Sequence, residues 1–283
     1  MGLPAILVEN YFNTLAFPGH TVTADEQAAG FEVFHLANGR RAPTDRYQAV
    51  TANTLHSAKA ACDRVRWATG LCLDRGHNLA QNAGVVAVLG SNDGWVTQRT
   101  VWSGVLPTAT TPNGSLDDPT GVVTEEGAFL VRFAGDGFTQ WRLSIPALGA
   151  GIVAQVVGAW IGMWIGLPYL KKPWTDGTAD IQSIEQQSAS GWLGSTVPVS
   201  RRAGTINLDT TSLYDEEQIR LHLDGQYLAA RRPMWFVPDD QQAERGFLVI
   251  RPKALAGLGY ESGWGYRVGR YPYQEHGPLR PGG

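Results

Sequence analysis

The chain has 283 residues, of which 17% are charged, and a formal net charge of −3. Globular chains average about 25% charged residues, and only four residues here are lysine. Without a broad cationic field to hold phosphate backbones, nucleic acid is excluded as an expected partner. With 43% hydrophobic residues and 34 glycines, the chain is expected to bury a core and to fold as one large or two ordinary domains.

The N-terminal segment, 1–12, lacks the basic region and the long apolar run of a secretory signal. Cys62 and Cys72 are too few for a disulfide framework or a four-ligand zinc site. We expect two buried free thiols on neighbouring strands, in a chain made in a reducing cytosol. Residues 51–62 show helical spacing, which leaves a short helix open there.

Short strands separated by turns are expected through the first half of the chain. A dense turn signal at 90–94 follows one apolar run, and Asp136 and Gly137 form a turn between two alternating segments. Residues 107–124 are rich in Pro, Thr, Gly, Asn and Asp and are predicted as a long surface loop. Strands are predicted at 85–89, 129–133 and 141–145.

One apolar stretch, 145–170, is long enough to cross a bilayer and holds a single strongly polar side chain, Gln155. Its Val-, Ile- and Trp-rich middle, with a proline near each end, favours strands. We therefore predict buried strands and keep a membrane-inserting segment at 151–167 as an alternative. The alternative draws on three glycines at the spacing by which transmembrane helices approach one another: Gly158, Gly162 and Gly166.

The composition changes at 171–177, and a run rich in glutamine and serine follows at 180–190. This is the predicted domain boundary, which divides the chain into a first domain (1–172), a linker (173–190) and a β-rich second domain (191–283).

In the second domain, a capping box at 212–215 predicts a helix of roughly three turns that stops near Gly225. Further strands are predicted at 206–208, 234–237, 247–250 and 264–268.

No catalytic constellation is legible in the sequence. The six histidines are scattered without the i, i+4 spacing of a zinc-binding pair, and neither a Walker pattern nor a Gly-x-Ser-x-Gly elbow occurs. Loop carboxylates such as Asp117 and Asp118 are typical of solvated surface. We therefore expect neither enzymatic activity nor a cofactor or metal.

The aromatic surplus carries more information. Nine tryptophans from Trp95 to Trp264 are considered, and core packing is expected for most of them. Trp174 and Trp192 lie among Pro, Gly, Ser and Thr in and just after the linker, so they are candidate interface anchors.

Two motifs between Val65 and Trp102 carry a family resemblance. The first ends a strand with Asp74, Gly76, His77, Asn78 and Leu79. The second ends another strand with Gly90, Ser91, Asn92, Asp93, Gly94 and Trp95. Together they resemble the middle of galactose-binding-like (discoidin-type) jelly rolls, in the version found in bacteriophage tail and baseplate proteins.

Residues 141–145 and 157–162 look like the final strands of that jelly roll, and 232–239 is similar to an element of phage distal tail and baseplate ring proteins. No ligand set carries over from the family. His77 and Asn78 are interpreted as turn residues whose side chains satisfy local backbone groups.

The predicted fold is therefore mainly all-β: a galactose-binding-like jelly-roll sandwich with a smaller β-rich domain that holds one helix. The resemblance implies a structural virion protein of a tailed phage, made in the host cytoplasm. It would form a ring in the tail tip or baseplate with copies of itself and other tail proteins. The alternative is a carbohydrate-binding module that recognises host surface sugars through loop aromatics such as Trp95. No membrane partner is expected.

Overall fold

The structure is a computed structural model, and the residues that it describes are 2–37, 45–167, 179–182, 185–187, 193–195, 199–209, 221–223, 227, 232–250, 261–263, 266–275 and 280–281. They fall into two compact units. The first unit comprises Met1–Gly166 and Met234–Phe247, and the second comprises Leu167–Pro233 and Leu248–Gly283. These units are defined by spatial contacts, whereas the domain limits at 172 and 190 stay a prediction.

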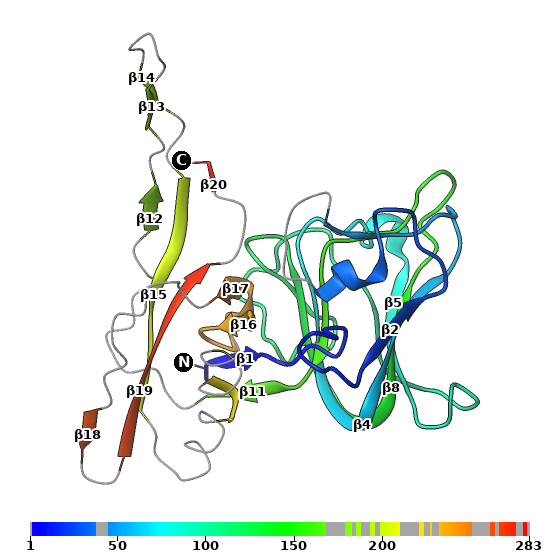
Figure 1. Cartoon of the computed structure of the whole chain (residues 1–283), viewed down its shortest axis with the longest axis horizontal. Coiled ribbons are helices and arrows are strands. Elements are labelled where there is room, and N and C mark those ends of the chain that lie inside the picture. Colours follow the sequence, from blue (N-terminus) through cyan, green and yellow to red (C-terminus); the bar gives the residue numbers. More distant parts are fainter. Residues whose placement is uncertain are drawn as a thin grey trace. The chain divides into compact units, whose positions relative to one another are not determined.

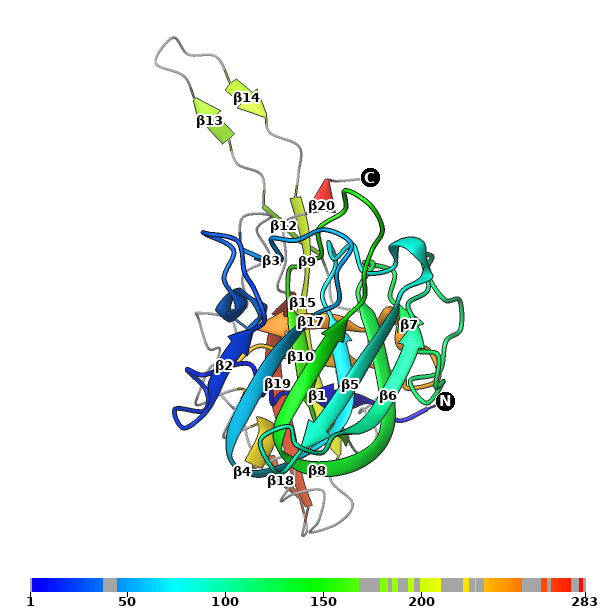
Figure 2. The same cartoon turned by 90° about the vertical axis from the view of Figure 1, so that its right-hand side faces the viewer.

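Two long antiparallel strands, β4 (His56–Leu73) and β8 (Phe129–Ile145), organise the first unit. They pair over most of their length and curve together (Figure 2) where the register shifts between Ala61 and Arg66. We call this region the bend. The predicted turn at 136–137 is wrong, because Gly137 pairs with Trp67 inside one continuous strand.

The bend divides the paired strands into two layers, each extended by shorter strands (Figure 1). The halves of β4 and β8 that contain His56 and Ile145 form the first layer with β2 (Thr21–Ala24), β5 (Val85–Ser91) and β6 (Arg99–Val105). The other halves form the second layer with β7 (Val122–Val123) and β10 (Ala159–Gly162). A short pair, β3 (Tyr47–Gln48) and β9 (Gln155–Val156), completes this region.

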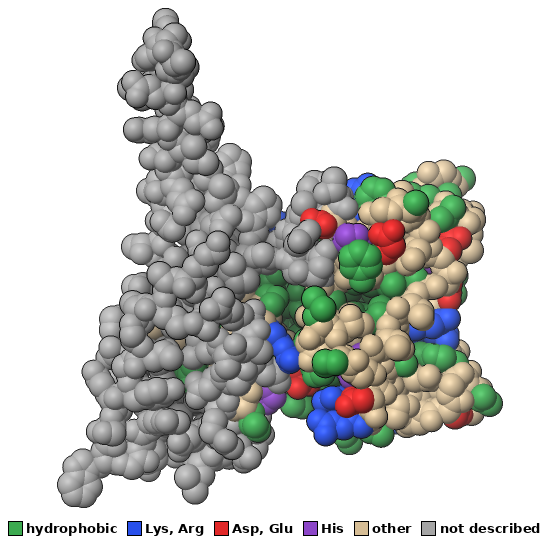
Figure 3. All heavy atoms as spheres, in the orientation of Figure 1, with side chains coloured by type: hydrophobic (Ala, Val, Ile, Leu, Met, Phe, Trp, Pro, Cys, Tyr) green, Lys and Arg blue, Asp and Glu red, His purple; other side chains and the backbone are tan. Residues whose placement is uncertain are grey.

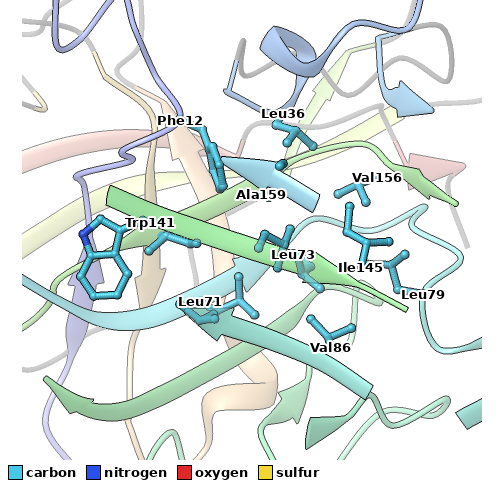
Figure 4. Close-up of a cluster of buried hydrophobic side chains, with 14 of the residues drawn as sticks. Phe12, Leu36, Leu71, Leu73, Leu79, Val86, Trp141, Ile145, Val156 and Ala159 are labelled. Atoms are coloured by element: carbon cyan, nitrogen blue, oxygen red, sulfur yellow. The ribbon is translucent and has the colours of Figure 1, made fainter. Parts of the chain in front are cut away.

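The main core lies between these two layers (Figure 4). Alternation along each strand turns every second side chain inward, so Trp141 and Ile145 of the first layer join one buried cluster with Leu71 and Leu73 of the second. Ala58 and Ala60 also face this cluster, and both are almost fully buried. The short helix left open at 51–62 is therefore wrong, because His56 begins β4 and the alanines are small inward residues of that strand.

A third layer covers the far side of the second layer. It consists of β1 (Ala5–Leu7), β11 (Trp164–Gly166) and β16 (Met234–Val237). Its Trp235 packs edge-on against Trp160 of β10, with ring centroids 5.9 Å apart. Because β10 is buried on both faces, its sequence is continuously apolar, which explains the membrane-like stretch. The predicted buried strands are confirmed, and no helix among the described residues is long and apolar enough to cross a membrane.

Helical structure in the first unit is limited, within the described ranges, to three short 3-10 helices: η1 (Val33–Ala37), η2 (Gln81–Ala83) and η4 (Ala243–Arg245). The predicted loop at 107–124 holds only the two-residue strand β7 at its end. The two cysteines are free thiols, as expected, but both lie on β4 rather than on neighbouring strands, and Cys62 is only partly buried.

The second unit is built on β15 (Val199–Asp209) paired with β19 (Tyr266–Glu275). Ile206, Leu208 and Tyr271 are buried there. Strands β12 (Ala179–Gln182) and β20 (Arg280–Pro281) pair with β15, β17 (Phe247–Ile250) and β18 (Glu261–Gly263) pair with β19, and β13 (Glu185–Gln187) pairs with β14 (Leu193–Ser195).

The strands predicted at 206–208, 234–237 and 247–250 are confirmed. Most of the helix predicted from 212 lies outside the described residues, as do Trp174, Trp192 and Trp264. The mainly all-β class is confirmed for the described chain.

Candidate functional site

The first motif, which we call the inner turn (74–79), is attached to the segment that leads into β10. The Asp74 N–H donates to the Gly158 carbonyl at 2.8 Å. The Asn78 side chain donates to the Val153 carbonyl and accepts from the Gln155 N–H, both at 2.8 Å. Leu79 belongs to the main core (Figure 4). The inner turn therefore joins two parts of the sandwich: the Asn78 side chain satisfies backbone groups, but these lie 75 and 77 residues away rather than in its own turn, where the sequence interpretation placed them.

His77 and Gly76 have structural reasons to lie in the inner turn. Gly76 has φ +87°, a conformation that favours glycine. Burial lowers the pKa of His77 to about 4, so its ring is neutral at pH 7, and its Nδ1 has no hydrogen-bond partner among the described residues. Asp74 is fully buried. Gly76 is exposed and His77 and Asn78 are partly exposed, but the Asn78 side chain is occupied by distant backbone groups.

The second motif, which we call the outer turn (90–95), begins the loop between β5 and β6. The Ser91 hydroxyl donates to Asp93 at 2.8 Å and accepts from the Trp95 N–H at 3.1 Å. Asp93 accepts hydrogen bonds from the Thr97 hydroxyl at 2.6 Å and from the Thr97 N–H at 2.9 Å. These bonds hold the pKa of Asp93 below its ordinary value. The loop is thus held by its own side chains.

Asn92 anchors the outer turn to the bend. Its Oδ1 accepts from the Thr139 N–H at 2.8 Å, and its Nδ2 donates to the Gly137 carbonyl at 3.5 Å. At the base of the turn, a Cβ on Gly90 would overlap the Phe138 ring, so this position requires glycine. Figures 1 and 2 show the β5–β6 loop beside the bend of β4 and β8.

Trp95 has a strained backbone at the end of the outer turn. Its φ is +72°, in the left-handed region that bulky residues rarely adopt and that costs roughly 1–2 kcal/mol. The preceding Gly94 has φ +71° and has nothing within 4 Å of a hypothetical Cβ, so it lies in open space. Strain of this kind persists where surrounding structure over-determines it, and it clusters at binding sites.

A polar strip lies beside Trp95 on the outer face of the first layer. The Arg142 guanidinium stands 4.0 Å from the centroid of the Trp95 ring and donates to Gln98 at 3.1 Å. Lys59, opposite Arg142 on β4, binds Asp25 at 2.6 Å. We call Asp25, Ser57, Lys59, Gln98 and Arg142 the outer strip.

The outer strip holds one carboxylate, Asp25, and two cations, Lys59 and Arg142, and Asp93 of the adjacent outer turn brings the formal charge of the whole site to zero. Partial burial tends to raise the pKa of Asp25, but hydrogen bonds from Lys59 and Ser57 outweigh it, and the pKa is lowered. Arg142 Nε has no hydrogen-bond partner among the described residues. Over the visible face of the first unit, charged side chains are scattered rather than gathered into one patch (Figure 3). The surface therefore offers hydrogen-bonding groups without a strong net field.

A second exposed tryptophan, Trp67, lies at the bend, with 58% of its surface exposed. Two buried aromatic side chains fix the backbone here, because Trp141 Nε1 donates to the Arg66 carbonyl at 3.2 Å and the Tyr11 hydroxyl donates to the Trp67 carbonyl. The Trp67 indole lies over two glycines of β8. A Cβ on Gly137 would lie 3.0 Å from Trp67 Nε1, and a Cβ on Gly135 would lie 3.6 Å from the Trp67 ring.

Sequence reasoning missed Trp67. Its flanking residues read as an ordinary strand, and only the irregular register at the bend turns the ring outward. A signal was present in the alternating glycines of 135–137, since glycine inside a strand marks the close approach of another group. Among the residues that the structure describes, no group of His, Cys, Asp or Glu is placed to hold a metal ion.

Neither a protein-family model nor a curated protein matches the sequence. Among solved structures, the family 32 CBM of NanJ from Clostridium perfringens, in complex with galactose, is 10% identical with a TM-score of 0.38. The match covers 52% of this chain and 95% of that one. Chitosan-binding module 1 from a chitosanase/glucanase of Paenibacillus sp. IK-5 is 15% identical with a TM-score of 0.37, over 54% and 98% of the two chains.

A fucosidase from Ruminococcus gnavus, in complex with fucose, is 9% identical with a TM-score of 0.41, over 55% of this chain and 26% of that one. The sugars bound by these proteins are properties of those proteins. The virion, tail and baseplate parts of the sequence interpretation find no support in the comparisons.

Proposed function

We propose that the first unit is a non-catalytic carbohydrate-binding module whose site is formed by Trp95 and the outer strip. The observation that carries the proposal is the backbone of Trp95, at φ +72°. A large, partly exposed aromatic side chain is held in an unfavourable conformation by the hydrogen bonds of Ser91 and Asp93. Trp95 is not part of the core, so this backbone strain does not serve core packing. It is best explained by the place at the surface in which it holds the indole ring.

The chemistry beside the ring suits a neutral sugar. A sugar ring has an apolar face of C–H groups and a rim of hydroxyls that both donate and accept hydrogen bonds. Arg142 covers one face of the Trp95 ring, so a sugar would stack on the opposite face. Gln98 and Arg142 offer an acceptor and donors within the same cluster. Asp25 and Asp93 together offset the two cations, so the site as a whole has no formal net charge, which favours a neutral ligand over an anion.

Location in a virion and assembly into a ring stay predictions that rest on the sequence resemblance alone. They are compatible with sugar binding, since a tail protein that contacts a host surface would need such a module. No described residue contributes an observation that favours the ring over the binding module.

The proposal is tested by screening the purified chain on an array of neutral glycans and measuring the affinity of each hit by calorimetry. We expect the wild type to bind and Trp95→Ala to lose at least ten-fold in affinity. Val96→Ala is the matched control, because Val96 is the next residue and is 83% exposed. A wild type that binds no glycan, or a Trp95→Ala variant that binds as well as the wild type, would refute the proposal.

A further inference from the structure

We propose that this site is extended, with Trp67 as a second sugar-stacking position, so that its ligand is an oligosaccharide of several units rather than one terminal sugar. The inference rests on the proposed function of Trp95. It goes further by assigning a role to an exposed aromatic residue that the outer strip does not use.

The Trp67 ring is supported from below. Glycines at 135 and 137 leave room for the indole to lie close over the backbone of β8, and the Trp67 side chain is 58% exposed. The carbonyls of Arg66 and Trp67 are held by Trp141 and Tyr11 from the core. A pre-positioned ring loses little conformational entropy on binding, which is what a stacking surface needs.

The backbone of β8 and the outer turn connects the two tryptophans over a short path. Gly137 is the cross-strand partner of Trp67, which places their Cα atoms about 4.5–5.5 Å apart. Asn92 donates to the Gly137 carbonyl. Three residues further along the loop, the Trp95 Cα lies at most about 11 Å from the Asn92 Cα. These bounds place the two tryptophans within reach of one oligosaccharide of several units.

The polar groups between the rings match a hydroxyl-rich chain. The Asn92 amide lies on this path. Asp136 lies at the bend beside Gly137 and pairs with the 73% exposed Arg99 at 2.7 Å. This pair offers an acceptor and donors without net charge. A neutral oligosaccharide can therefore form hydrogen bonds between two aromatic contacts.

A protein partner fits this surface less well. At the bend, the exposed large apolar side chains are Trp67 and Val65, and an aromatic side chain of this exposure offers on the order of 150 Å². A stable protein interface buries about 800 Å² on each partner. Even when Trp95 and the 83% exposed Val96 of the neighbouring loop are added, these four apolar side chains with polar neighbours fall short of that area.

The test is a length series measured by calorimetry on the full chain. The probes are the mono-, di-, tri- and tetrasaccharides of galactose, N-acetylglucosamine and glucose. For the series that the wild type binds, we expect affinity to rise at least ten-fold from monosaccharide to tetrasaccharide. Trp67→Ala should abolish this rise and leave monosaccharide affinity unchanged, whereas Trp95→Ala should lower the affinity for both.

Two further variants distinguish a loss of sugar binding from a loss of folding. Gly137→Ala keeps the indole but places a Cβ 3.0 Å from Trp67 Nε1, so it should reduce the rise in part. Leu55→Ala removes a 65% exposed side chain that directly precedes β4, away from the bend, and should change nothing. The melting temperature of each variant is measured alongside.

Distinct results separate the two proposals. If Trp67→Ala keeps the full rise, or the wild type binds monosaccharide and tetrasaccharide equally, the extended site is wrong while the proposed function stands. If Trp67→Ala changes the sedimentation of the chain but not sugar affinity, Trp67 is a protein contact and the extended site is wrong. If no probe binds the wild type, both proposals fail.

Discussion

The inner turn (74–79) and the outer turn (90–95) are built from the same residue types, glycine, asparagine and aspartate, and each follows a strand of the same sandwich. Their side chains nevertheless have different partners. Asn78 of the inner turn binds the backbone of Val153 and Gln155, far away in sequence. Asp93 of the outer turn binds Thr97 within its own loop.

This difference shows what turns a loop into a binding surface. Hydrogen-bonding groups of the inner turn are paired with distant parts of the fold, so these groups serve packing and are not available to a ligand. The outer turn makes many of its hydrogen bonds within itself, and Asn92 and Ser91 link it to Thr139 of β8, which leaves Trp95 at the surface. A self-supporting loop can hold a strained aromatic residue outward, whereas a loop that closes the sandwich cannot.

The largest expected effect is on the stability of the inner turn. Asn78→Ala removes two hydrogen bonds of 2.8 Å and leaves a carbonyl and an N–H unpaired, which should destabilise the fold by about 2–4 kcal/mol. Urea unfolding measures the change. Asn92→Ala is the matched control in the outer turn and should cost about 1 kcal/mol or less, because Asn92 is exposed. An equal loss of unfolding free energy in the Asn78→Ala and Asn92→Ala variants would contradict the distinction between the inner and outer turns.

A pH effect should follow from His77. Burial holds its pKa at about 4 in the folded chain, against an ordinary value of 6.5. The unfolded chain therefore binds the extra proton first, and stability is lost as the pH falls from 6.5 to 4, by about 1–3 kcal/mol. Urea unfolding at several pH values measures this loss. His77→Gln should flatten the profile in this window, and an unchanged profile would contradict the assignment.

A smaller effect is expected from relieving the strain in the outer turn. Trp95→Gly and Trp95→Ala both remove the ring, but only glycine adopts φ +72° freely. Trp95→Gly should therefore be more stable than Trp95→Ala by about 1 kcal/mol. Thermal melts of the two variants compare them directly, and the reverse order would show that the backbone is not strained in solution.

The smallest effect concerns Asp93, whose pKa is lowered by hydrogen bonds from Thr97. Because the folded pKa lies below the ordinary 3.8, the ordering of Thr97 is present above that value and is lost as the pH falls through the folded pKa. The Thr97 amide shift, followed by NMR, should report this transition. Asp93→Asn should abolish it while leaving the similar pair of Asp118 and Thr120 unaffected.

Local patterns predicted much of the fold. Alternation at 129–133 and 141–145 predicted strands with one buried face, and the apolar run at 85–89 predicted β5. Both turns were also recognisable, because glycine at φ +87° and φ +71° is a requirement of the local backbone. These features depend on neighbours in sequence, so the sequence reveals them.

Other features could not be predicted because they depend on register. Glycine is a residue type typical of turns, yet the pairing of Gly137 with Trp67 keeps Gly137 inside a strand. Whether Asn78 or Asn92 faces the interior depends on which distant segment comes to lie beside it. The exposure of Trp67 depends on Tyr11 and Trp141 holding its backbone from the core.

The sequence by itself thus determined the all-β class, the positions of most strands and the two turns, since these follow from side-chain alternation and local backbone preference. Only the tertiary structure decided which turn is bonded to distant segments and which one carries the candidate site. It also decided that the bend brings Trp67 to the same end as Trp95. The physical reason is that strand pairing sets which side chains meet, and pairing is a property of segments far apart in the chain.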